Sequence, residues 1–246
     1  MMNKSKTKIL VQKYGGSSLA DPQRIKAVAE RIGHSYDKNN KTVAVVSAMG
    51  DTTNKLIEMA KTVNGAPNDR EMDLLLSTGE IVSCTLVTMA LHSIGYPAIG
   101  LTGGQAGIHT DPYHSRAKIL DIDTDRILHE IAEGKIVIVA GFQGTTTEMD
   151  VTTLGRGASD TTAVALAASL KADICEIYTD VDGIYTADPR IVPNARKLDE
   201  IGYEEMLELA ASGAKMNPRS IELGALYNVP IRVTSSFSDS PGTLIH

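Results

Sequence analysis

Short runs of consecutive apolar residues recur along the chain and alternate with longer amphipathic stretches. A strand whose neighbouring residues are all apolar is buried on both faces, which is typical of a parallel sheet covered by helices. Five such runs lie at residues 9–11, 42–46, 97–101, 135–140 and 174–178. The pattern therefore predicts an α/β protein with a mainly parallel central sheet.

The stretches between these runs have apolar residues at helical spacing. Ile25, Val28 and Ile32 fall on one face of a stretch that starts with Asp21, an N-cap, followed by Pro22. The turn signal Asp182 followed by Gly183 predicts a hairpin after the fifth run. Further helices are expected over 53–63, 70–94, 125–133, 161–170, 203–211 and 218–227, and a final strand over 231–233.

The rest of the chain is polar, and its composition is that of an ordinary folded domain. The segments 105–125 and 145–157 read as polar loops, apart from a helix start at Thr124. There is no internal repeat or low-complexity linker, so we expect one domain over 1–246 with two lobes. A chain of this length buries roughly three quarters of its unfolded surface and needs no disulfide.

Charge and aromatic content exclude several classes of partner. The net charge is −6 and only 4% of residues are aromatic, which argues against a nucleic-acid-binding surface. The N-terminus lacks the apolar core of a secretory signal, and no apolar run approaches the ~20 residues of a membrane span. Cys84 and Cys175 stand in apolar contexts, as reduced core thiols of a cytoplasmic protein do.

Small and polar residues follow each of the five apolar runs. In a parallel sheet the carboxyl ends of the strands meet at one edge, where ligands bind. The segments expected at that edge are 15–18 (GGSS), 47–50 (SAMG), 103–104 (GG), 141–144 (GFQG) and 179–180 (TD). One glycine pair would be an ordinary turn, but five such loops predict a binding site.

The first loop has the composition of an anion site. Lys13 stands at the strand end, and Gly15 and Gly16 then offer backbone N–H groups ahead of a helix. The order of residues fits neither a Walker A loop nor a dinucleotide-binding loop. Further along, Arg156 lies between glycines and suits a carboxylate, while Tyr185 and Arg190 suit a base and a phosphate. His109 and His114 lack the spacing of a metal site, so we expect no metal ligands.

Five segments, in order, resemble motifs of the aspartokinases. Residues 13–18 (KYGGSS) are similar to KFGGTS, 153–160 (TLGRGASD) to TLGRGGSD, and 179–190 (TDVDGIYTADPR) to TDVPGIYTTDPR; 76–80 (LSTGE) and 213–215 (GAK) resemble LxxxGE and FGAK. The likeness runs from Lys8 to Leu244. It implies the three-layer αβα sandwich of the amino-acid-kinase fold, with an amino-acid-binding lobe at roughly 1–150 and a nucleotide-binding lobe at roughly 151–246.

The resemblance also implies an activity. The expected reaction is ATP-dependent phosphorylation of the side-chain carboxylate of L-aspartate to 4-phospho-L-aspartate, with Mg²⁺, in lysine and threonine biosynthesis. Catalytic roles fall to Lys13 and Asp160. The expected aspartate-binding residues are Ser47, Thr53, Glu80, Phe142, Arg156 and Ser159. The expected nucleotide-binding residues are Lys13, Gly15, Gly16, Ser17, Thr179, Asp180, Tyr185, Arg190 and Lys215. A homodimer in the cytoplasm is expected.

Some features depart from the family pattern. The chain stops where typical aspartokinases continue into paired ACT domains, so we expect no feedback control by lysine or threonine, or a separate chain that carries ACT domains. Ser17, Gly104 and Asn217 differ from the usual residues at their positions. Two alternatives therefore stay open: a paralogous kinase that acts on a modified aspartate, and a non-catalytic amino-acid-binding partner subunit.

Overall fold

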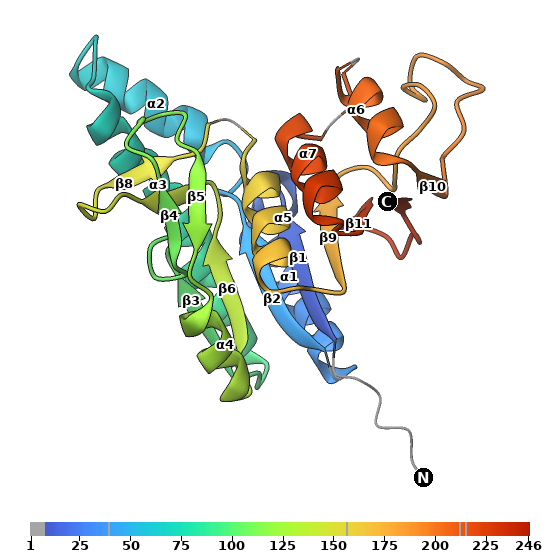
Figure 1. Ribbon diagram of the computed structural model, residues 1–246, viewed down its shortest axis with the longest axis horizontal. Helices are drawn as coiled ribbons and strands as arrows, with labels where there is room; N and C mark the ends of the chain where they lie inside the picture. The colour runs from blue at the N-terminus through green and yellow to red at the C-terminus, as the bar shows by residue number, and fades with distance from the viewer. Residues whose placement is uncertain (1–7, 39, 156, 212, 215) are drawn as a thin grey trace.

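A computed structural model describes residues 8–38, 40–155, 157–211, 213–214 and 216–246. Its centre is an eight-stranded sheet with the order β10-β12-β11-β9-β1-β2-β6-β3 (Figure 1). All pairs in it are parallel except β11 with β12. The strands are β1 Ile9–Tyr14, β2 Lys41–Val46, β3 Ala98–Leu101, β6 Ile136–Ala140, β9 Ile174–Thr179, β10 Glu200–Ile201, β11 Ile231–Ser235 and β12 Thr243–Ile245.

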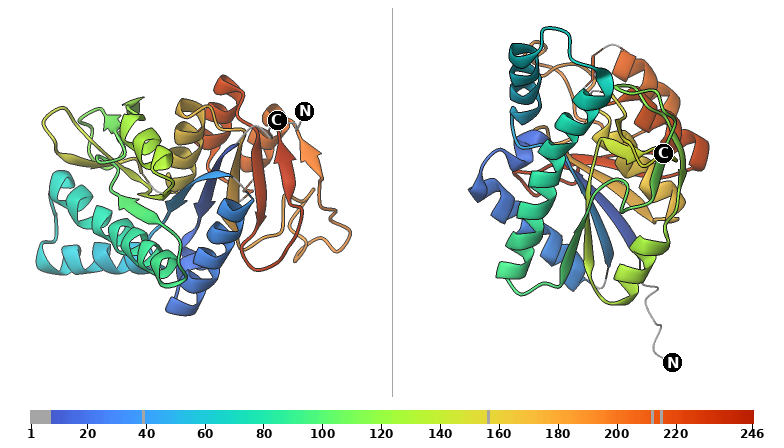
Figure 2. Two further views of the ribbon diagram at one scale, coloured as in Figure 1. Left: turned by 90° about the horizontal axis from the view of Figure 1, so that it is seen from below. Right: turned by 90° about the vertical axis from the view of Figure 1, so that its left-hand side faces the viewer.

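Helices cover both faces of this sheet and give three layers (Figure 2). The helices are η1 Gly16–Leu19, α1 Pro22–Asp37, α2 Thr52–Val63, α3 Asp69–Ser93, α4 Asp125–Ala132, α5 Ser159–Ser169, α6 Tyr203–Ala211 and α7 Pro218–Tyr227. Val43 and Val45 of β2 pack in the core with α4, α5 and α7. Their neighbours Ala44 and Val46 point the other way and pack with α1 and α3. Successive residues of one apolar run are therefore buried on opposite faces of the sheet, which confirms the predicted αβα sandwich.

A second sheet occupies segments that the sequence pattern presents as loops. It has four short strands in the order β5-β4-β7-β8: β4 Ile108–Thr110, β5 Ile119–Ile122, β7 Gln143–Thr145 and β8 Val151–Thr153. The prediction of polar loops over 105–125 and 145–157 was therefore wrong at these strands. Polar residues tolerate burial here because they are hydrogen-bonded, as Thr110 and Thr152 are to each other at 2.5 Å. Because β7 and β8 pair, a lobe boundary near 150 would divide this sheet.

The predicted hairpin at Asp182 and Gly183 does not form. Ile184 donates its N–H to Thr243 Oγ1 at 2.8 Å, and Tyr185 makes only an isolated bridge with Lys197. The segment after β9 is thus bound to β12 and does not form the second strand of a hairpin. Ile184 and Thr243 are 59 residues apart along the chain, so a local sequence pattern does not predict their contact.

Helix α3 is the longest helix and is strongly apolar. Within the described residues it alone is long and apolar enough to cross a membrane, with 44% of the relevant window buried inside the protein. It lies against β3 and β6 and carries buried polar side chains, as a core helix does. Cys84 on this helix and Cys175 on β9 are both free and buried, as expected.

Candidate active site

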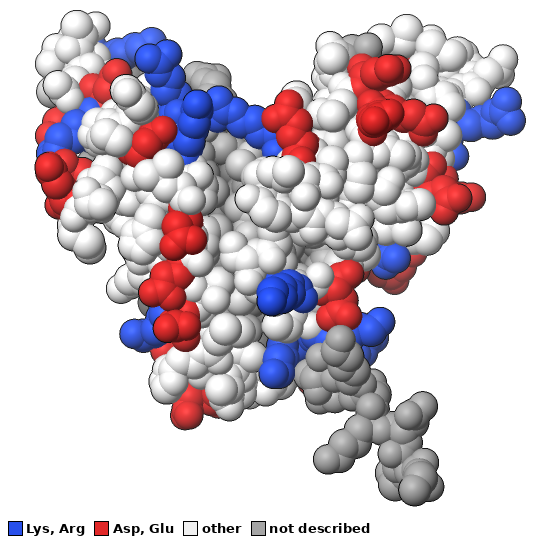
Figure 3. All heavy atoms as spheres, in the orientation of Figure 1, with Lys and Arg blue, Asp and Glu red and all other residues white. Residues whose placement is uncertain are grey.

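The loops that follow β1, β2 and β6 meet α3 and the start of α5 at a cavity of about 320 Å³. The molecule is notched at the same end as these strand ends, and Lys and Arg side chains extend into the notch from the side of α2 (Figure 3). The cavity is lined by Lys13, Gly16, Ser47, Ala48, Gly50, Thr53, Asn54, Glu80, Phe142, Gly157, Ser159 and Asp160. Three of the five predicted loops, those after β1, β2 and β6, thus meet at one cavity, whereas residues 103–104 and 179–180 do not line it.

Lys13 and Asp160 form the charged centre of this cavity. Lys13 Nζ lies 2.7 Å from Asp160 Oδ1, and each side chain is only about one-tenth exposed (12% and 11%). The contact is an ion pair without hydrogen-bond alignment, since Asp160 Oδ1 has no hydrogen-bond partner within the described residues. A Cβ on Gly15 would lie 3.4 Å from Lys13 Nζ. A glycine at position 15 therefore leaves the ammonium room to meet a ligand.

The loop after β1 is packed tightly against the loop after β2. A Cβ on Gly16 would come within 2.8 Å of the Ala48 carbonyl oxygen, closer than real side chains allow. Gly50 also donates its N–H to the Gly16 carbonyl at 3.0 Å. The N–H of Gly15 already donates to the Tyr178 carbonyl at 3.4 Å, so it is not the open donor that the sequence suggests. Ser17 is exposed at the start of η1.

Glu80 of α3 is a buried carboxyl group for which no ion pair is present among the described residues. It is 4% exposed, and its Oε1 accepts the Ala48 N–H at 3.1 Å. Oε2 has no hydrogen-bond partner in the part of the chain that the structure describes. Burial raises the pKa of Glu80 to about 7. An unsatisfied buried oxygen that lines a cavity is suited to bind a cationic group.

Phe142 joins three elements at the wall of the cavity. Its backbone is in the left-handed region with φ of 68°, which is costly for a residue with a side chain. Hydrogen bonds hold it there: its N–H donates to Thr162 Oγ1 at 3.0 Å, and its carbonyl accepts the Leu154 N–H at 2.9 Å. The end of β6 is thereby fixed against α5 and against the segment after β8.

The predicted nucleotide-binding residues after β9 do not line this cavity. Thr179 Oγ1 donates to Asp180, and Tyr185 OH donates to Asp182 Oδ1 at 3.0 Å. Arg190 is 77% exposed and pairs with Asp188, with Nη2 2.6 Å from Oδ2. These residues belong to the strand next to β1 and to the segment that follows it. Arg156 and Lys215 lie outside the described residues.

The sequence analysis missed four of the lining residues. Ala48 and Gly50 belong to a loop that it marked, but without a role. Gly157 likewise belongs to the 153–160 motif but was given no role of its own, and Asn54 carried no signal, because α2 places it at the cavity only through the fold.

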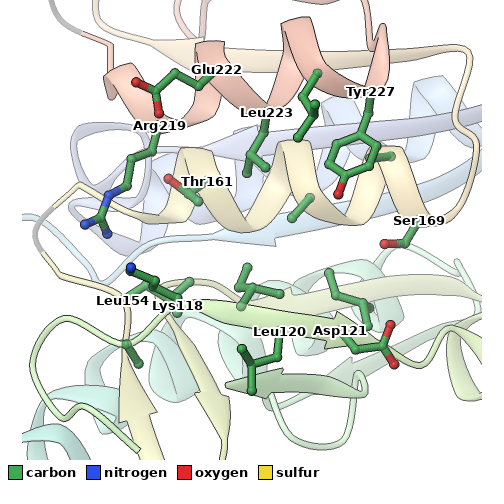
Figure 4. Close-up of a pocket in the computed structure, with 16 residues that line it drawn as sticks. Lys118, Leu120, Asp121, Leu154, Thr161, Ser169, Arg219, Glu222, Leu223 and Tyr227 are labelled. Carbon is green, nitrogen blue, oxygen red and sulfur yellow. The ribbon is translucent and has the colours of Figure 1, made fainter. Parts of the chain in front are cut away.

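Other cavities are separate from this one. A cavity of about 480 Å³ lies between β5, α5 and α7, with an apolar floor that includes Leu223 (Figure 4). Arg219 and Lys118 extend toward each other at one end of it. Over the described residues there is no group of three or more His, Cys, Asp or Glu side chains that could hold a metal. His114 instead contacts Asp73, with Nδ1 3.0 Å from Oδ2.

Comparison with known proteins shows that most of the chain is similar to amino acid kinases. Residues 8–235 match the model of the amino acid kinase family. An aspartokinase of Mycolicibacterium smegmatis is 58% identical over 239 residues, which are 96% of this chain and 57% of that protein. The aspartate kinase structure from Synechocystis has a TM-score of 0.87 at 49% identity and matches 96% of this chain and 39% of its own.

A further solved structure holds ligands. The E. coli aspartokinase III complex with aspartate and ADP has a TM-score of 0.87 at 28% identity, and the match covers 97% of this chain and 64% of that one. The chain thus spans little more than half the length of the curated relatives it matches.

Proposed function

The chain belongs to the amino acid kinase family, and from that premise we propose that it transfers the γ-phosphoryl group of ATP to the side-chain carboxylate of L-aspartate. The products are ADP and 4-phospho-L-aspartate. The observation that carries the proposal is the cavity itself, which combines a buried Lys13–Asp160 pair with a buried Glu80 whose Oε2 has no hydrogen-bond partner among the described residues. High identity to aspartokinases over 96% of the chain supports aspartate as the acceptor.

The chemistry asks little of acid–base catalysis. A carboxylate is already nucleophilic near pH 7, so no general base has to remove a proton from it. The difficulty is electrostatic, because a carboxylate oxygen must approach a polyanionic phosphate in line with the leaving group. Lys13 supplies positive charge where the transferring group passes, and Asp160 orients its ammonium group.

The two ends of the amino acid need different partners. In this proposal Glu80 receives the ammonium group, since its buried Oε2 has no hydrogen-bond partner within the described residues, whereas Asp160 Oδ1 already has the Lys13 ammonium beside it. Arg156 binds the α-carboxylate, as the resemblance implies. Ser47, Thr53, Phe142 and Ser159 complete the pocket that fixes the side-chain carboxylate toward Lys13. Held this way, the reacting oxygen gains the proximity that accounts for much of catalysis.

The nucleotide is assigned to the strand ends beside the cavity. Gly15, Gly16 and Ser17 lie next to Lys13 and are suited to the phosphates. Thr179, Asp180, Tyr185, Arg190 and Lys215 are proposed to hold the rest of ATP. The parallel pairing of β1 with β9 supports this division, because it sets the end of β9 directly beside the end of β1.

The role of Mg²⁺ follows from the donor set. The described residues offer no cluster of acidic side chains for a metal, so the ion fits as part of the nucleotide complex, with phosphate oxygens and water as its ligands. Bound there, it neutralises charge on the phosphates. Lys13 provides the protein's share of that charge compensation, together with backbone N–H groups of Gly16 and Ser17, since the Gly15 N–H is bound to the Tyr178 carbonyl.

We further propose a homodimer that works in the cytoplasm. Val82, Leu86 and Met89 lie on one exposed face of α3, with exposed fractions of 50%, 37% and 58%. Strand β3 beside this helix forms an edge of the large sheet. An apolar helix face next to a sheet edge is the kind of surface that a second copy covers.

A hydroxylamine-capture assay tests the acceptor. An acyl phosphate reacts with hydroxylamine to give a hydroxamate, so each candidate acid is incubated with the protein, ATP, Mg²⁺ and hydroxylamine. We expect hydroxamate from L-aspartate and little from L-glutamate. Product from a substituted aspartate but not from aspartate would favour the paralogous kinase. Nucleotide binding without any product would favour the non-catalytic partner subunit.

A further inference from the structure

Asp73 is a carboxyl group on α3 with no exposed surface. It lies two helical turns before Glu80 on the buried face of the same helix. Burying a carboxylate is costly unless donors surround it. The groups that surround Asp73 therefore show what this residue holds in place.

The donors come from two segments that are distant in sequence. From the loop before β5, the Ser115 N–H donates to Oδ2 at 2.9 Å, and His114 Nδ1 lies 3.0 Å from the same oxygen. From the end of β8, Thr153 donates its N–H to Oδ2 at 2.9 Å and its hydroxyl to Oδ1. One carboxylate thus joins a helix, a loop and a strand end.

The loop segment needs this anchor because its backbone is strained. Ser115 has a φ of 65°, in the left-handed region that residues with a side chain rarely adopt. Its N–H is bound by Asp73, while Ala117 donates its N–H to the Thr153 carbonyl at 2.9 Å. The loop and the end of β8 therefore hold each other in register as well as binding α3.

The end of β8 leads directly into the wall of the cavity. Leu154 follows Thr153 and donates its N–H to the Phe142 carbonyl at 2.9 Å. Leu154, Phe142, Ala117 and Ala158 form one small apolar cluster. Phe142 lines the cavity beside Ser159 and Asp160. A displacement of Thr153 would therefore reach Phe142 through a single hydrogen bond.

We propose that Asp73 is a positioning residue for the amino-acid side of the cavity. It fixes Thr153, and through Leu154 it fixes Phe142. The loop at residues 15–18 is hydrogen-bonded to Gly50 of the loop after β2 and to Tyr178 of β9, and no hydrogen bond among the described residues joins it to Asp73. Loss of Asp73 should thus weaken binding of the amino acid and leave binding of the nucleotide nearly unchanged, an inference that rests on the proposed function.

The variant Asp73→Asn tests the positioning in the free protein. An amide of the same shape can no longer accept hydrogen bonds at all the positions that the carboxylate serves. We expect backbone amide hydrogen exchange at 113–118 and 151–155 to accelerate by about tenfold or more, and exchange at 9–19 to stay as in the wild type. Unchanged exchange in both segments would overturn the proposal, whatever reaction the protein catalyses.

Kinetics of the same variant test the consequence. We expect KM for aspartate to rise about tenfold, while KM for ATP stays within about twofold. The matched control is Asp150→Asn, which removes the charge from the 2.6 Å contact of Asp150 Oδ1 with Arg70 Nη2 and so weakens the ion pair between α3 and the β7–β8 turn. This control should leave both constants unchanged. Equal rises of both constants in Asp73→Asn would mean that Asp73 only stabilises the fold.

If Asp73→Asn does not fold, variants of Thr153 test whether the contact between Asp73 and Thr153 positions the cavity. Thr153→Val removes the hydroxyl that Asp73 binds, and Thr153→Ser keeps it. The first should raise KM for aspartate and the second should not; equal behaviour would overturn the role of this contact. A wild-type protein that does not phosphorylate aspartate would refute the proposed function but not the positioning, which the exchange measurement decides separately.

Discussion

At the scale of single residues, the cavity sets two carboxyl groups in contrasting surroundings. Asp160 has the Lys13 ammonium 2.7 Å away, whereas Glu80 accepts backbone N–H groups such as that of Ala48, and its Oε2 has no hydrogen-bond partner within the described residues. Burial therefore raises the pKa of Glu80 to about 7. The contrast explains how one cavity can offer a fixed ion pair to the phosphoryl group and a vacant acceptor to an ammonium group.

The raised pKa of Glu80 predicts a pH dependence. Below pH 7 the group carries a proton and no longer attracts the ammonium group of aspartate, whose own charges do not change in this range. We expect KM for aspartate to rise about tenfold between pH 8 and pH 6. Steady-state kinetics across this range give the measurement.

The control for this dependence is Glu80→Gln. The amide does not titrate, so this variant should have a high KM for aspartate at pH 8 and show little further rise toward pH 6. If the variant kept the wild-type slope, another group would be responsible and the assignment of Glu80 would be wrong.

At the scale of elements, α3 organises the amino-acid side of the site. Asp73 binds the loop before β5 and the end of β8, the Ser77 carbonyl accepts Gln143 Nε2 at 3.0 Å, and Glu80 binds the loop after β2. Three polar groups on one buried helix face thus fix three walls of the cavity. The sequence singled out only Glu80, because an acidic residue within an amphipathic stretch normally indicates a solvated face. Asp73 could have been found in the sequence because it lies at helical spacing from residues expected on the buried face of this helix.

The tight approach of two loops gives a prediction at the same scale. In Gly16→Ala the added Cβ would lie 2.8 Å from the Ala48 carbonyl oxygen, so the loop after β1 must move away from the loop after β2. We expect a loss of about 1–3 kcal/mol in the free energy of unfolding and a several-fold higher KM for ATP. Thermal unfolding and steady-state kinetics measure the two effects.

Gly65→Ala serves as the matched control, since a Cβ at Gly65 meets nothing within 4 Å. It should change neither quantity. A Gly16→Ala protein with wild-type KM for ATP would show that this loop does not bind the phosphates.

The central strands were predictable from sequence and the small sheet was not. Runs such as 42–46 and 135–140 are continuous, and burial on both faces of a parallel sheet is what such runs require. Strands β4, β7 and β8 have three residues each and contain polar side chains such as Thr152. Their pairing is decided by partners far along the chain, for which a local pattern carries no signal.

At the scale of the whole molecule, a net charge of −6 coexists with a buried lysine at the carboxyl edge of the sheet, where we propose that anions bind. The sheet order places β1 between β2 and β9, so that Lys13 lies beside the loops from both neighbouring strands. The sequence predicted this gathering because parallel strands share one carboxyl edge. Five residues that the sequence assigned to one pocket, Ser47, Thr53, Glu80, Phe142 and Ser159, all line one cavity, and their role in binding aspartate is a proposal. The nucleotide residues after β9 remain a proposal.

Ligand binding should stabilise the whole molecule. Aspartate and ADP with Mg²⁺ are each added at about 100 times the Kd. Binding at that concentration adds ~2.7 kcal/mol per ligand site to the free energy of unfolding, which should raise Tm by roughly 5–10 °C per site. Differential scanning fluorimetry measures the shift. Lys13→Ala should lose most of the shift caused by ADP; an equal shift in this variant would show that the nucleotide binds elsewhere.

The central claim is that Lys13 is the catalytic cation in phosphoryl transfer to aspartate. The hydroxylamine-capture assay with L-aspartate, ATP and Mg²⁺ tests this claim most directly. Wild-type protein and the control Lys41→Ala, altered at an exposed lysine at the start of β2, should both form the hydroxamate. Lys13→Ala should remain folded and form at most about one-thousandth as much. Hydroxamate formation by Lys13→Ala at the wild-type rate, or none by the wild-type protein, would contradict the account.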